Sequence, residues 1–543
     1  APPPARRTHE HARRAARRRG VWWGRLGPTP CALAWRCAGM PSIKECVSLH
    51  IGQAGCQVGA RSWELFTQEH GIHPDGTRGG FDDRSDYDPD DDAYNSFFHA
   101  TGTGQYVPRC VMVDTEPTVI NDIKVSSMRN LFHPDSLIHF KRDCKSNYFE
   151  GLQMARDFKI ADIVMDRMRS AIELCDNPQG FFVFHAFGGG TGAGVGVELL
   201  KGMREEFGKK KAIFQPVIFP SKTYSSSIVE PYNCLLATSN SKEYVDMSIL
   251  MDNEAVYRMC NNNLQLKTPH FNHVNCLIAQ CISGLTGPLR YETVLNSTLT
   301  EIQNNLVPKP EFMYPILSIA PVRHEARKGH EQFRTADIIG ELFDGKNFLC
   351  DVTALNSNRY LAAVVMMRGH REDDQDDHKG STSGAAFATM SPADQKFKPI
   401  NVNSVTSAIN SLRQLGKTGN AKRVINFVPW MSGSGVKVGI VKSSPVVTEK
   451  FCMATPKRQG LLLGNTTAVR QLFSRQYIRF LKLWFKRAYQ WQMEGAGGTI
   501  EDIEEAKETV RTIMDSYEAE LGQSASQESQ STQPLFLTSR PLQ

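Results

Sequence analysis

The feature that most restricts the fold of this chain is a run of glycines between a strand pattern and a helix pattern. The apolar segment FFVFHAF (181–187) leads directly into GGGTGAG (188–194), and a helical pattern follows through Leu199. Glycines let the backbone approach a phosphate closely, and their N–H groups form an anion-binding nest beside a helix N-terminus. The turn matches neither GxGxxG nor GxxxxGKS/T, the two commonest nucleotide fingerprints. A nucleotide-binding turn and a plain tight turn therefore both stay open.

A second glycine turn has the same setting. HIGQAG (50–55) follows an apolar strand pattern at 46–51 and begins another helix. Further strand patterns at 109–114 and 213–219 alternate with helical segments, which favours a parallel α/β sheet with ligand loops at the carboxyl ends of its strands. We therefore expect both turns to close on one polyphosphate.

Two acids follow the second strand pattern, in the segment VDTEPT. Asp114 and Glu116 stand where a ligand loop is expected. A carboxylate there can hold a phosphate-bound Mg²⁺ through water. The alternative is an acid that caps a helix or stabilises a turn.

Two segments are candidates for a base pocket, MDNEAVY (251–257) and FNHVNCL (271–277). The edge of guanine presents an acceptor beside donors, and an Asn amide offers both complements. Phe271 and Asn275 are four residues apart and share one face of a helix, so the ring can stack on a base while the amide reads its edge. The alternative is a helix that packs an aromatic side chain into a core.

The net charge of +6 does not describe the globular part of the chain. Residues 1–39 carry nine Arg and one acid, a local charge of +8, which leaves +6 − 8 = −2 for the remainder. A nucleic-acid partner is therefore not expected. No stretch approaches 18 uninterrupted apolar residues, so no membrane span is expected. The 13 Cys are scattered without CxxC pairs, which indicates reduced thiols rather than a disulfide frame or zinc site.

Taken together, the motifs resemble the α-tubulins. The resemblance covers roughly Glu45 to Leu521. Seven segments occur in tubulin order and at tubulin-like spacings: ECVSLHIGQAGCQVG, VPRCVMVDTEPTVI, FHAFGGGTGAG, IVEPYN, DNEAVY, LTEIQNNLVP and NTTAV. The fold that this implies is α/β, with a parallel-sheet nucleotide-binding domain, a central helix, a second smaller α/β domain and a C-terminal helical hairpin.

The resemblance also implies the cofactors, GTP and Mg²⁺, and a role for individual residues. Gln53 would contact the phosphates and Mg²⁺, and Glu116 would be the Mg²⁺-associated acid. Ser226 matches a hydroxyl position near the ribose. The full set of implied nucleotide-binding residues is Gln53, Glu116, Gly190, Thr191, Ser226, Asn253, Phe271 and Asn275.

Glu301 distinguishes the α-type from the β-type. In LTEIQNNL, Leu299, Ile302 and Leu306 form one helical stripe, and Glu301 lies about 120° from it, so it should be exposed. Taken alone, such a residue is a solvated surface Glu. In α-tubulins this position carries the Glu that reaches the nucleotide of the next subunit, where a carboxylate can orient or deprotonate the attacking water; β-tubulins typically have Lys.

The predicted organisation has six parts. They are a disordered basic extension at 1–39, a GTP-binding domain at 40–252, an intermediate domain at 253–466 with a central helix at about 271–290, a disordered insertion at 371–399, C-terminal helices at 467–521 and a disordered tail at 522–543.

The implied function is that of an α-type tubulin, a GTP-binding subunit of microtubules in the cytoplasmic cytoskeleton. It would pair with β-tubulin, keep its own GTP unhydrolysed and non-exchangeable, and use Glu301 to complete the GTPase site of the adjacent β subunit. Microtubule-associated proteins and motors are further candidate partners. The first alternative is an assembly-impaired paralogue that binds GTP and β-tubulin without efficient polymerisation. The second is a self-contained GTPase like the bacterial cell-division filament proteins.

Overall fold

The computed structural model describes most of the chain from Lys44 onward. The described ranges are 44–78, 92–221, 223–225, 227–293, 298–327, 333–352, 358–369, 400–417, 425–431, 435–448 and 451–531. The predicted extension at 1–39 and the predicted insertion at 371–399 lie outside them.

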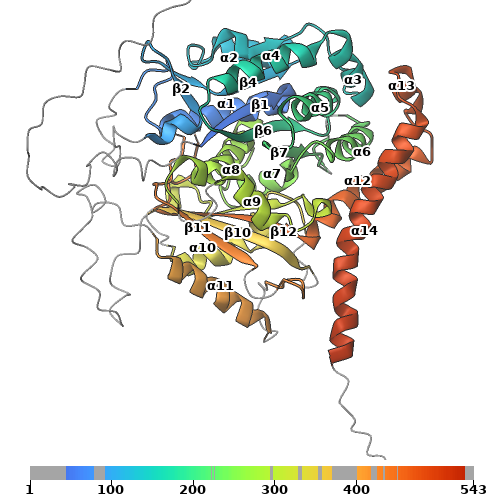
Figure 1. The fold of residues 1–543 in the computed structure, drawn as a ribbon. Helices are drawn as coiled ribbons and strands as arrows, with labels where there is room; N and C mark the ends of the chain where they lie inside the picture. The colour runs from blue at the N-terminus through green and yellow to red at the C-terminus, as the bar shows by residue number, and fades with distance from the viewer. Residues whose placement is uncertain are drawn as a thin grey trace, which may run out of the picture. The chain divides into compact units, whose positions relative to one another are not determined.

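Ten strands of the described residues form one sheet in the order β11-β10-β12-β9-β8-β7-β6-β1-β4-β5 (Figure 1). Their bounds are β1 Glu45–Ile51, β4 Cys110–Asp114, β5 Leu137–His139, β6 Pro178–Ala186, β7 Ala212–Phe219, β8 Met247–Asp252, β9 Ile316–Ala320, β10 Tyr360–Gly369, β11 Val436–Val441 and β12 Arg458–Thr466. A separate hairpin joins β2 Phe98–Ala100 to β3 Tyr106–Pro108.

The seven strands from β5 to β9 are all parallel, and β12 enters antiparallel between β9 and β10. The structure thus confirms the predicted α/β class with a parallel sheet. The sheet passes from the predicted first domain to the predicted second domain where β8 pairs with β9, through the residue pair Leu250 and Ile316. The boundary between those two domains stays a prediction.

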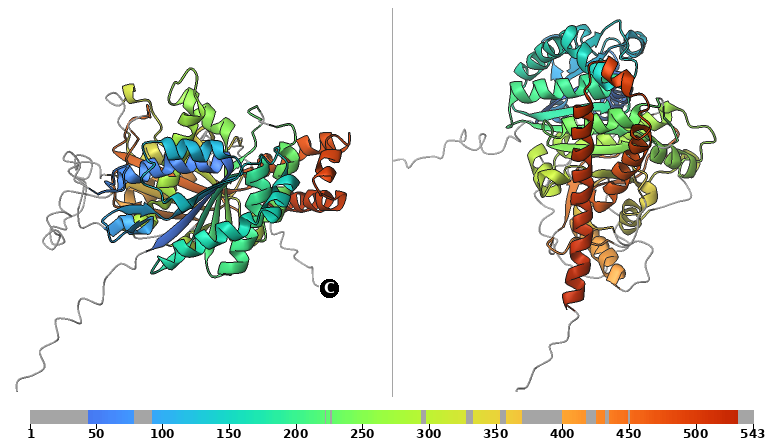
Figure 2. Two further views of the ribbon diagram at one scale, coloured as in Figure 1. Left: turned by 90° about the horizontal axis from the view of Figure 1, so that it is seen from above. Right: turned by 90° about the vertical axis from the view of Figure 1, so that its right-hand side faces the viewer.

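Helices cover both faces of the sheet (Figures 1 and 2). Their bounds are α1 Gly52–Glu69, α2 Pro117–Val125, α3 Tyr148–Asp157, α4 Ile160–Glu173, α5 Gly196–Phe207, α6 Glu230–Ser241, α7 Asn253–Asn262, α8 Phe271–Arg290, α9 Leu299–Leu306, α10 Thr335–Leu342, α11 Val402–Lys417, α12 Arg470–Trp484, α13 Gln490–Gly495 and α14 Ile500–Ser531. Within the described residues, none of these helices is both long and apolar enough to cross a bilayer.

Side chains alternate between two cores because successive residues of a strand point to opposite faces. In β6, Phe181 and Val183 join the core that contains α3 to α6, whereas Phe182 and Phe184 join the core under α1 and α8. The predicted central helix is α8, which packs along α1 and α7. Both faces of β6 are thus buried, as expected of a central parallel strand.

The C-terminal helices α12 and α14 pack side by side (Figures 1 and 2). The tail was predicted to begin at residue 522, but α14 continues to Ser531. Adding a residue to an existing helix costs far less than starting a new one, so a long helix can extend into a segment of weak helix formers. The prediction was therefore wrong for 522–531, and residues 532–543 lie outside the described ranges.

Candidate functional site

The two glycine turns lie against each other at the carboxyl ends of the adjacent strands β1 and β6. Gly52 has a φ of +71°, which L side chains rarely adopt, and a Cβ there would lie 3.4 Å from the Thr191 Cβ. The chain order reverses here, since β1 leads outward to β4 whereas β6 begins the other half of the sheet. Ligands of open α/β sheets bind at such a switch point. The two turns meet as expected, and their closing on one polyphosphate stays a prediction.

The glycines around this junction shape a cradle. A Cβ at Gly190 would lie 2.8 Å from the Asn147 backbone, so no larger residue fits there. A Cβ at Gly189 would meet nothing within 4 Å, which leaves its backbone beside open space. Thr191 is half-buried and begins the helical turn that leads into α5. Exposed amides next to a close-packed backbone are what a phosphate requires.

The loop after β4 joins the cradle through hydroxyl groups. Thr115 and Thr191 share a hydrogen bond of 2.7 Å between their Oγ1 atoms. Asp114 ends β4 in a buried position, and burial raises the pKa of its carboxyl to about 6. Glu116 stands at the N-cap position of α2, and its exposed side chain forms no capping hydrogen bond. Gln53 is exposed in the first turn of α1. The Glu116 carboxylate and the Gln53 amide are therefore both accessible, on the loops that follow β4 and β1.

Asn233, on α6, connects two loops of the site and was not predicted. Its fully buried amide donates to the carbonyl oxygens of Gly188 at 2.8 Å and Ser146 at 2.7 Å, and its Oδ1 accepts from the Tyr148 N–H at 3.0 Å. The sequence contains a signal for it in EPYN, at the start of α6. A buried amide with all these bonds holds the glycine turn in one conformation.

Glu230 is a second residue that the sequence analysis missed. Its buried carboxylate accepts from the Ser225 hydroxyl at 2.7 Å, and its Cγ lies 3.3 Å from where a Cβ on Gly188 would stand. It therefore joins the glycine turn to the serine-rich loop before α6, which is the side expected to hold a ribose. Ser226, predicted for that role, lies outside the described residues.

The predicted base-pocket residues lie on two packed helices, α7 and α8. Asn253 is half-buried at the first position of α7, and Asn275 is buried on α8. Phe271 is 58% exposed, and its ring meets that of Tyr257 edge-on at 6.0 Å. Tyr257 in turn stacks on Tyr224 at 4.4 Å. An accessible aromatic ring and two Asn amides on one pair of packed helices are side chains suited to a purine.

Glu301 lies at the opposite edge of the sheet. It follows the N-cap of α9, and its N–H donates to the Thr298 Oγ1 at 3.1 Å. The neighbouring Leu299 side chain lies 3.0 Å from where a Cβ on Gly180 would stand, near the amino end of β6. At about 3.3 Å per residue, the strand from Gly180 to Ala186 spans about 20 Å. The Glu301 carboxylate is thus remote from the glycine turns of its own chain.

The predicted exposure of Glu301 is wrong, because the side chain is half-buried. A helical wheel considers only the stripe of the helix itself, whereas Lys44, just before β1, lies close to this carboxylate in space. Burial lowers the pKa of Lys44, and the Glu301 charge opposes that shift.

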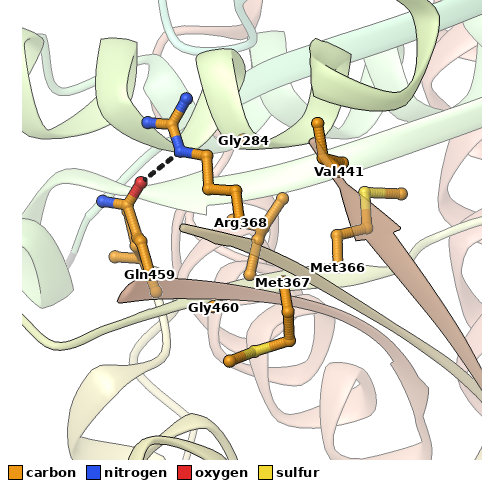
Figure 3. Close-up of a pocket in the computed structure, with 9 residues that line it drawn as sticks. Gly284, Met366, Met367, Arg368, Val441, Gln459 and Gly460 are labelled. Atoms are coloured by element: carbon orange, nitrogen blue, oxygen red, sulfur yellow. Dashed lines mark hydrogen bonds between the residues drawn. The ribbon is translucent and has the colours of Figure 1, made fainter. Parts of the chain in front are cut away.

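A small cavity lies elsewhere, between α8 and strands β9 to β12 (Figure 3). Its wall is apolar apart from Arg368 and Gln459, which are joined by a hydrogen bond of 2.8 Å from Nε to Oε1. None of the predicted site residues lines it, so it is separate from the glycine cradle.

Comparison with known proteins agrees with this geometry. Residues 45–261 match the family described as "Tubulin/FtsZ family, GTPase domain", and residues 398–477 match the tubulin C-terminal domain. The chain therefore belongs to the tubulin family, whose GTPase domain binds GTP. It is 36% identical over 478 residues, 88% of this chain and 96% of the relative, to the tubulin alpha-3 chain of Zea mays. Within the family it is thus a divergent relative of the α-tubulins, as the motifs predicted.

Proposed function

We propose that this chain is an α-type tubulin subunit that binds GTP at the glycine cradle and completes the GTPase site of a neighbouring β subunit. The observation that supports this proposal is the position of Glu301. The glycine turns follow the carboxyl ends of β1 and β6, whereas Glu301 lies beside their amino ends. Subunits stacked head to tail would bring Glu301 of one subunit toward the nucleotide cradle of the next.

Within the chain's own site, Gly190 and Thr191 would hold the phosphates and Asn253 and Asn275 would read guanine, with Phe271 stacked on the base. Mg²⁺ would neutralise the phosphates and take Glu116 and Gln53 as neighbours. The described residues contain no group of three or more His, Cys, Asp or Glu that could hold a metal ion. Glu116 and Gln53 as the neighbouring oxygen groups fit Mg²⁺, which typically uses one or two carboxylates together with phosphate oxygens and water.

Glu301 would orient or deprotonate the water that attacks the GTP of the adjacent subunit. The chain's own GTP would lie between the two subunits, non-exchangeable and unhydrolysed, because no equivalent carboxylate faces it from a β-type partner. The proposal places the chain in cytoplasmic microtubules, with β-tubulin as partner and with microtubule-associated proteins and motors on the polymer surface.

The test is co-expression with β-tubulin in a folding-competent lysate, followed by polymer pelleting and analysis of the retained nucleotide. We expect stoichiometric guanine nucleotide and co-pelleting of both chains. Guanine nucleotide in a dimer that does not pellet would indicate the alternative, an assembly-impaired paralogue. ATP, NAD or no nucleotide in the dimer would contradict the proposal, and GTP turnover by the isolated chain would point to a self-contained GTPase.

A point substitution tests the base pocket. Asn275→Ala removes a donor and an acceptor together, which should cost about 1–3 kcal/mol of binding preference for guanine. The ratio of retained GTP to ATP should therefore fall roughly 5- to 150-fold. Asn261→Ala, an exposed position on α7, is the matched control and should leave the ratio unchanged. An equal ratio in wild type and Asn275→Ala would remove this residue from base recognition.

A further inference from the structure

The small cavity of Figure 3 lies between α8 and strands β9 to β12. Its volume is about 10 Å³, close to what one water molecule needs. On α8, Gly284 leaves space opposite Leu461, because a Cβ on Gly284 would lie 3.4 Å from that side chain. The rest of the wall, apart from two polar side chains, is formed by Ile319, Met366, Met367, Val441 and Gly460. The cavity therefore has room for one small ligand and no more.

The two polar side chains of the wall each keep one donor without a partner. Arg368 and Gln459 are 4% and 2% exposed. The Arg368 Nε donates to the Gln459 Oε1 at 2.8 Å, and Figure 3 shows the guanidinium and the amide side by side. Among the residues that the structure describes, Arg368 Nη2 and Gln459 Nε2 have no hydrogen-bond partner. Nη2 shares a carbon with Nε, and Nε2 shares a carbon with Oε1, so both free donors lie next to this one bond.

The charge beside the cavity is unbalanced. Arg368 and Arg290 share the carboxylate of Glu69, and the three side chains are 5%, 0% and 1% exposed. Within the described ranges no other acid forms an ion pair with either guanidinium, so two positive charges against one negative charge leave a surplus of +1. His70, 3.2 Å from Arg290, adds no charge near pH 7, because burial lowers its pKa to about 3. A buried charge without compensation is costly, so a counter-charge here would stabilise the fold.

The free groups favour an anion over a water molecule. A buried water donates its own hydrogens and therefore needs acceptors as well as donors. The free nitrogens at this wall are donors, and the one side-chain oxygen, Gln459 Oε1, already accepts from Arg368. A monatomic anion only accepts, and hydrogen bonds between a guanidinium and an anion are stronger than neutral ones. The small volume excludes phosphate, sulfate and molecules that carry a carboxylate.

We propose that this cavity binds a monatomic anion of the size of chloride through Arg368 Nη2 and Gln459 Nε2. The anion would offset the surplus charge of the buried cluster where α8 packs on β10 and β12. The cavity is separate from the glycine cradle, so the proposal does not rest on GTP binding. The stability of the protein should then depend on which anion is present, beyond the general effect of salt.

The test compares the melting temperature of the full-length chain, with any partner that co-purifies, in potassium chloride and in potassium gluconate at equal ionic strength. Gluconate is too large for the cavity and reports the general effect of salt. Gln459→Met keeps a similar volume and removes the donor. Relative to this variant, wild type should gain on the order of 1–2 °C from chloride at about ten times the dissociation constant, and the gain should saturate. An equal response to chloride in both proteins would overturn the proposal.

Gln215→Met is the matched control. Gln215 is also buried in a strand, β7, but its Nε2 is hydrogen-bonded to the His185 Nε2 at 2.7 Å, and it does not line the cavity. This variant should keep the wild-type response to chloride. Loss of the response in Gln215→Met as well would show that chloride acts elsewhere, which contradicts the proposal.

If Gln459→Met does not fold, Gly284→Ala decides the question. The added methyl group occupies the cavity and leaves Arg368 and Gln459 unchanged, and it makes only an ordinary contact with Leu461. The saturating response to chloride should be lost in this variant. A response equal to that of wild type would overturn the proposal.

Crystals of the wild-type protein grown in bromide give a direct measurement. We expect an anomalous peak within hydrogen-bond distance of Arg368 Nη2 and Gln459 Nε2. Density without an anomalous signal would identify a water molecule there and would overturn the proposal, as would an empty cavity.

Discussion

Buried acids of this molecule behave in two opposite ways. The first is that of Glu69, which forms an ion cluster with Arg290 and Arg368 beside Ser283. The Glu69 carboxylate accepts from Arg290 at 2.6 Å, from Arg368 at 2.8 Å and from the Ser283 hydroxyl at 2.6 Å. Burial raises the pKa of Glu69, but the two guanidinium groups overcome it and bring the pKa to about 2.

The second group consists of Asp114 and Asp252, at the carboxyl ends of β4 and β8. Burial raises their pKa values to about 6 and about 7. Within the described residues neither carboxyl forms an ion pair; Asp252 accepts from the Glu254 N–H at 3.0 Å. Glu69 is thus an acid whose ion pairs stabilise the fold, whereas Asp114 and Asp252 are acids without ion pairs at the strand ends where a ligand is expected.

Substitution of Glu301 should give the largest effect, because we assign this half-buried acid to catalysis rather than to stability. Glu301→Ala should leave folding and GTP binding of this chain intact. GTP hydrolysis coupled to assembly should fall by about 10²–10⁴-fold, the scale for loss of a positioned base. The measurement is phosphate released per subunit polymerised, at matched polymer mass.

The control for Glu301 is Glu311→Ala, an exposed acid shortly after α9. It should release phosphate at the wild-type rate. If Glu301→Ala also does so, the carboxylate has no part in hydrolysis.

The ion cluster predicts the next largest effect, on stability. Glu69→Gln leaves Arg290 and Arg368 buried without their counter-charge, so the free energy of unfolding should drop by about 3–5 kcal/mol. Glu64→Gln on the same helix removes the pair with Arg61, whose side chain is 31% exposed, and should cost less than about 1 kcal/mol. Urea unfolding of the heterodimer at fixed concentration compares them, and equal losses would contradict the distinction.

The pH dependence of the same cluster has a definite sign. The folded pKa of Glu69, about 2, lies below its unfolded value of about 4.3. Its stabilisation is therefore present above pH 4.3 and is lost as the pH falls toward 2. Glu69→Gln should lose less stability than wild type over that interval.

Asp252 should show the opposite slope. Its folded pKa of about 7 lies above the unfolded value of about 3.9, so stability is highest below pH 3.9 and declines as the pH rises through 7. Asp252→Asn keeps a good N-cap for α7 and removes the ionisation. Melting temperature against pH should be flatter for the variant than for wild type between pH 4 and 7; identical slopes would contradict the unpaired-acid interpretation.

Local sequence patterns were sufficient for the elements that carry the nucleotide site. The strands at 46–51 and 181–187 and the glycine turns after them appear where the patterns indicated, and the helix at 271–290 appears where the resemblance implied it. Apolar periodicity and glycine content act over a few residues, so neighbouring residues alone reveal them. The α-type identity also followed from local motifs, including the acid at Glu301.

The arrangement of distant residues depended on the folded chain. Nothing in the local patterns indicates that Asn233 holds the Ser146 loop, or that Glu69, Arg290 and Arg368 meet in one cluster. The half-burial of Glu301 likewise depends on the folded chain, which no helical wheel includes. These contacts join segments far apart in the sequence, and parallel strand order decides which segments become neighbours. That order places the glycine turns at the carboxyl ends of β1 and β6 and Glu301 near the amino end of β6.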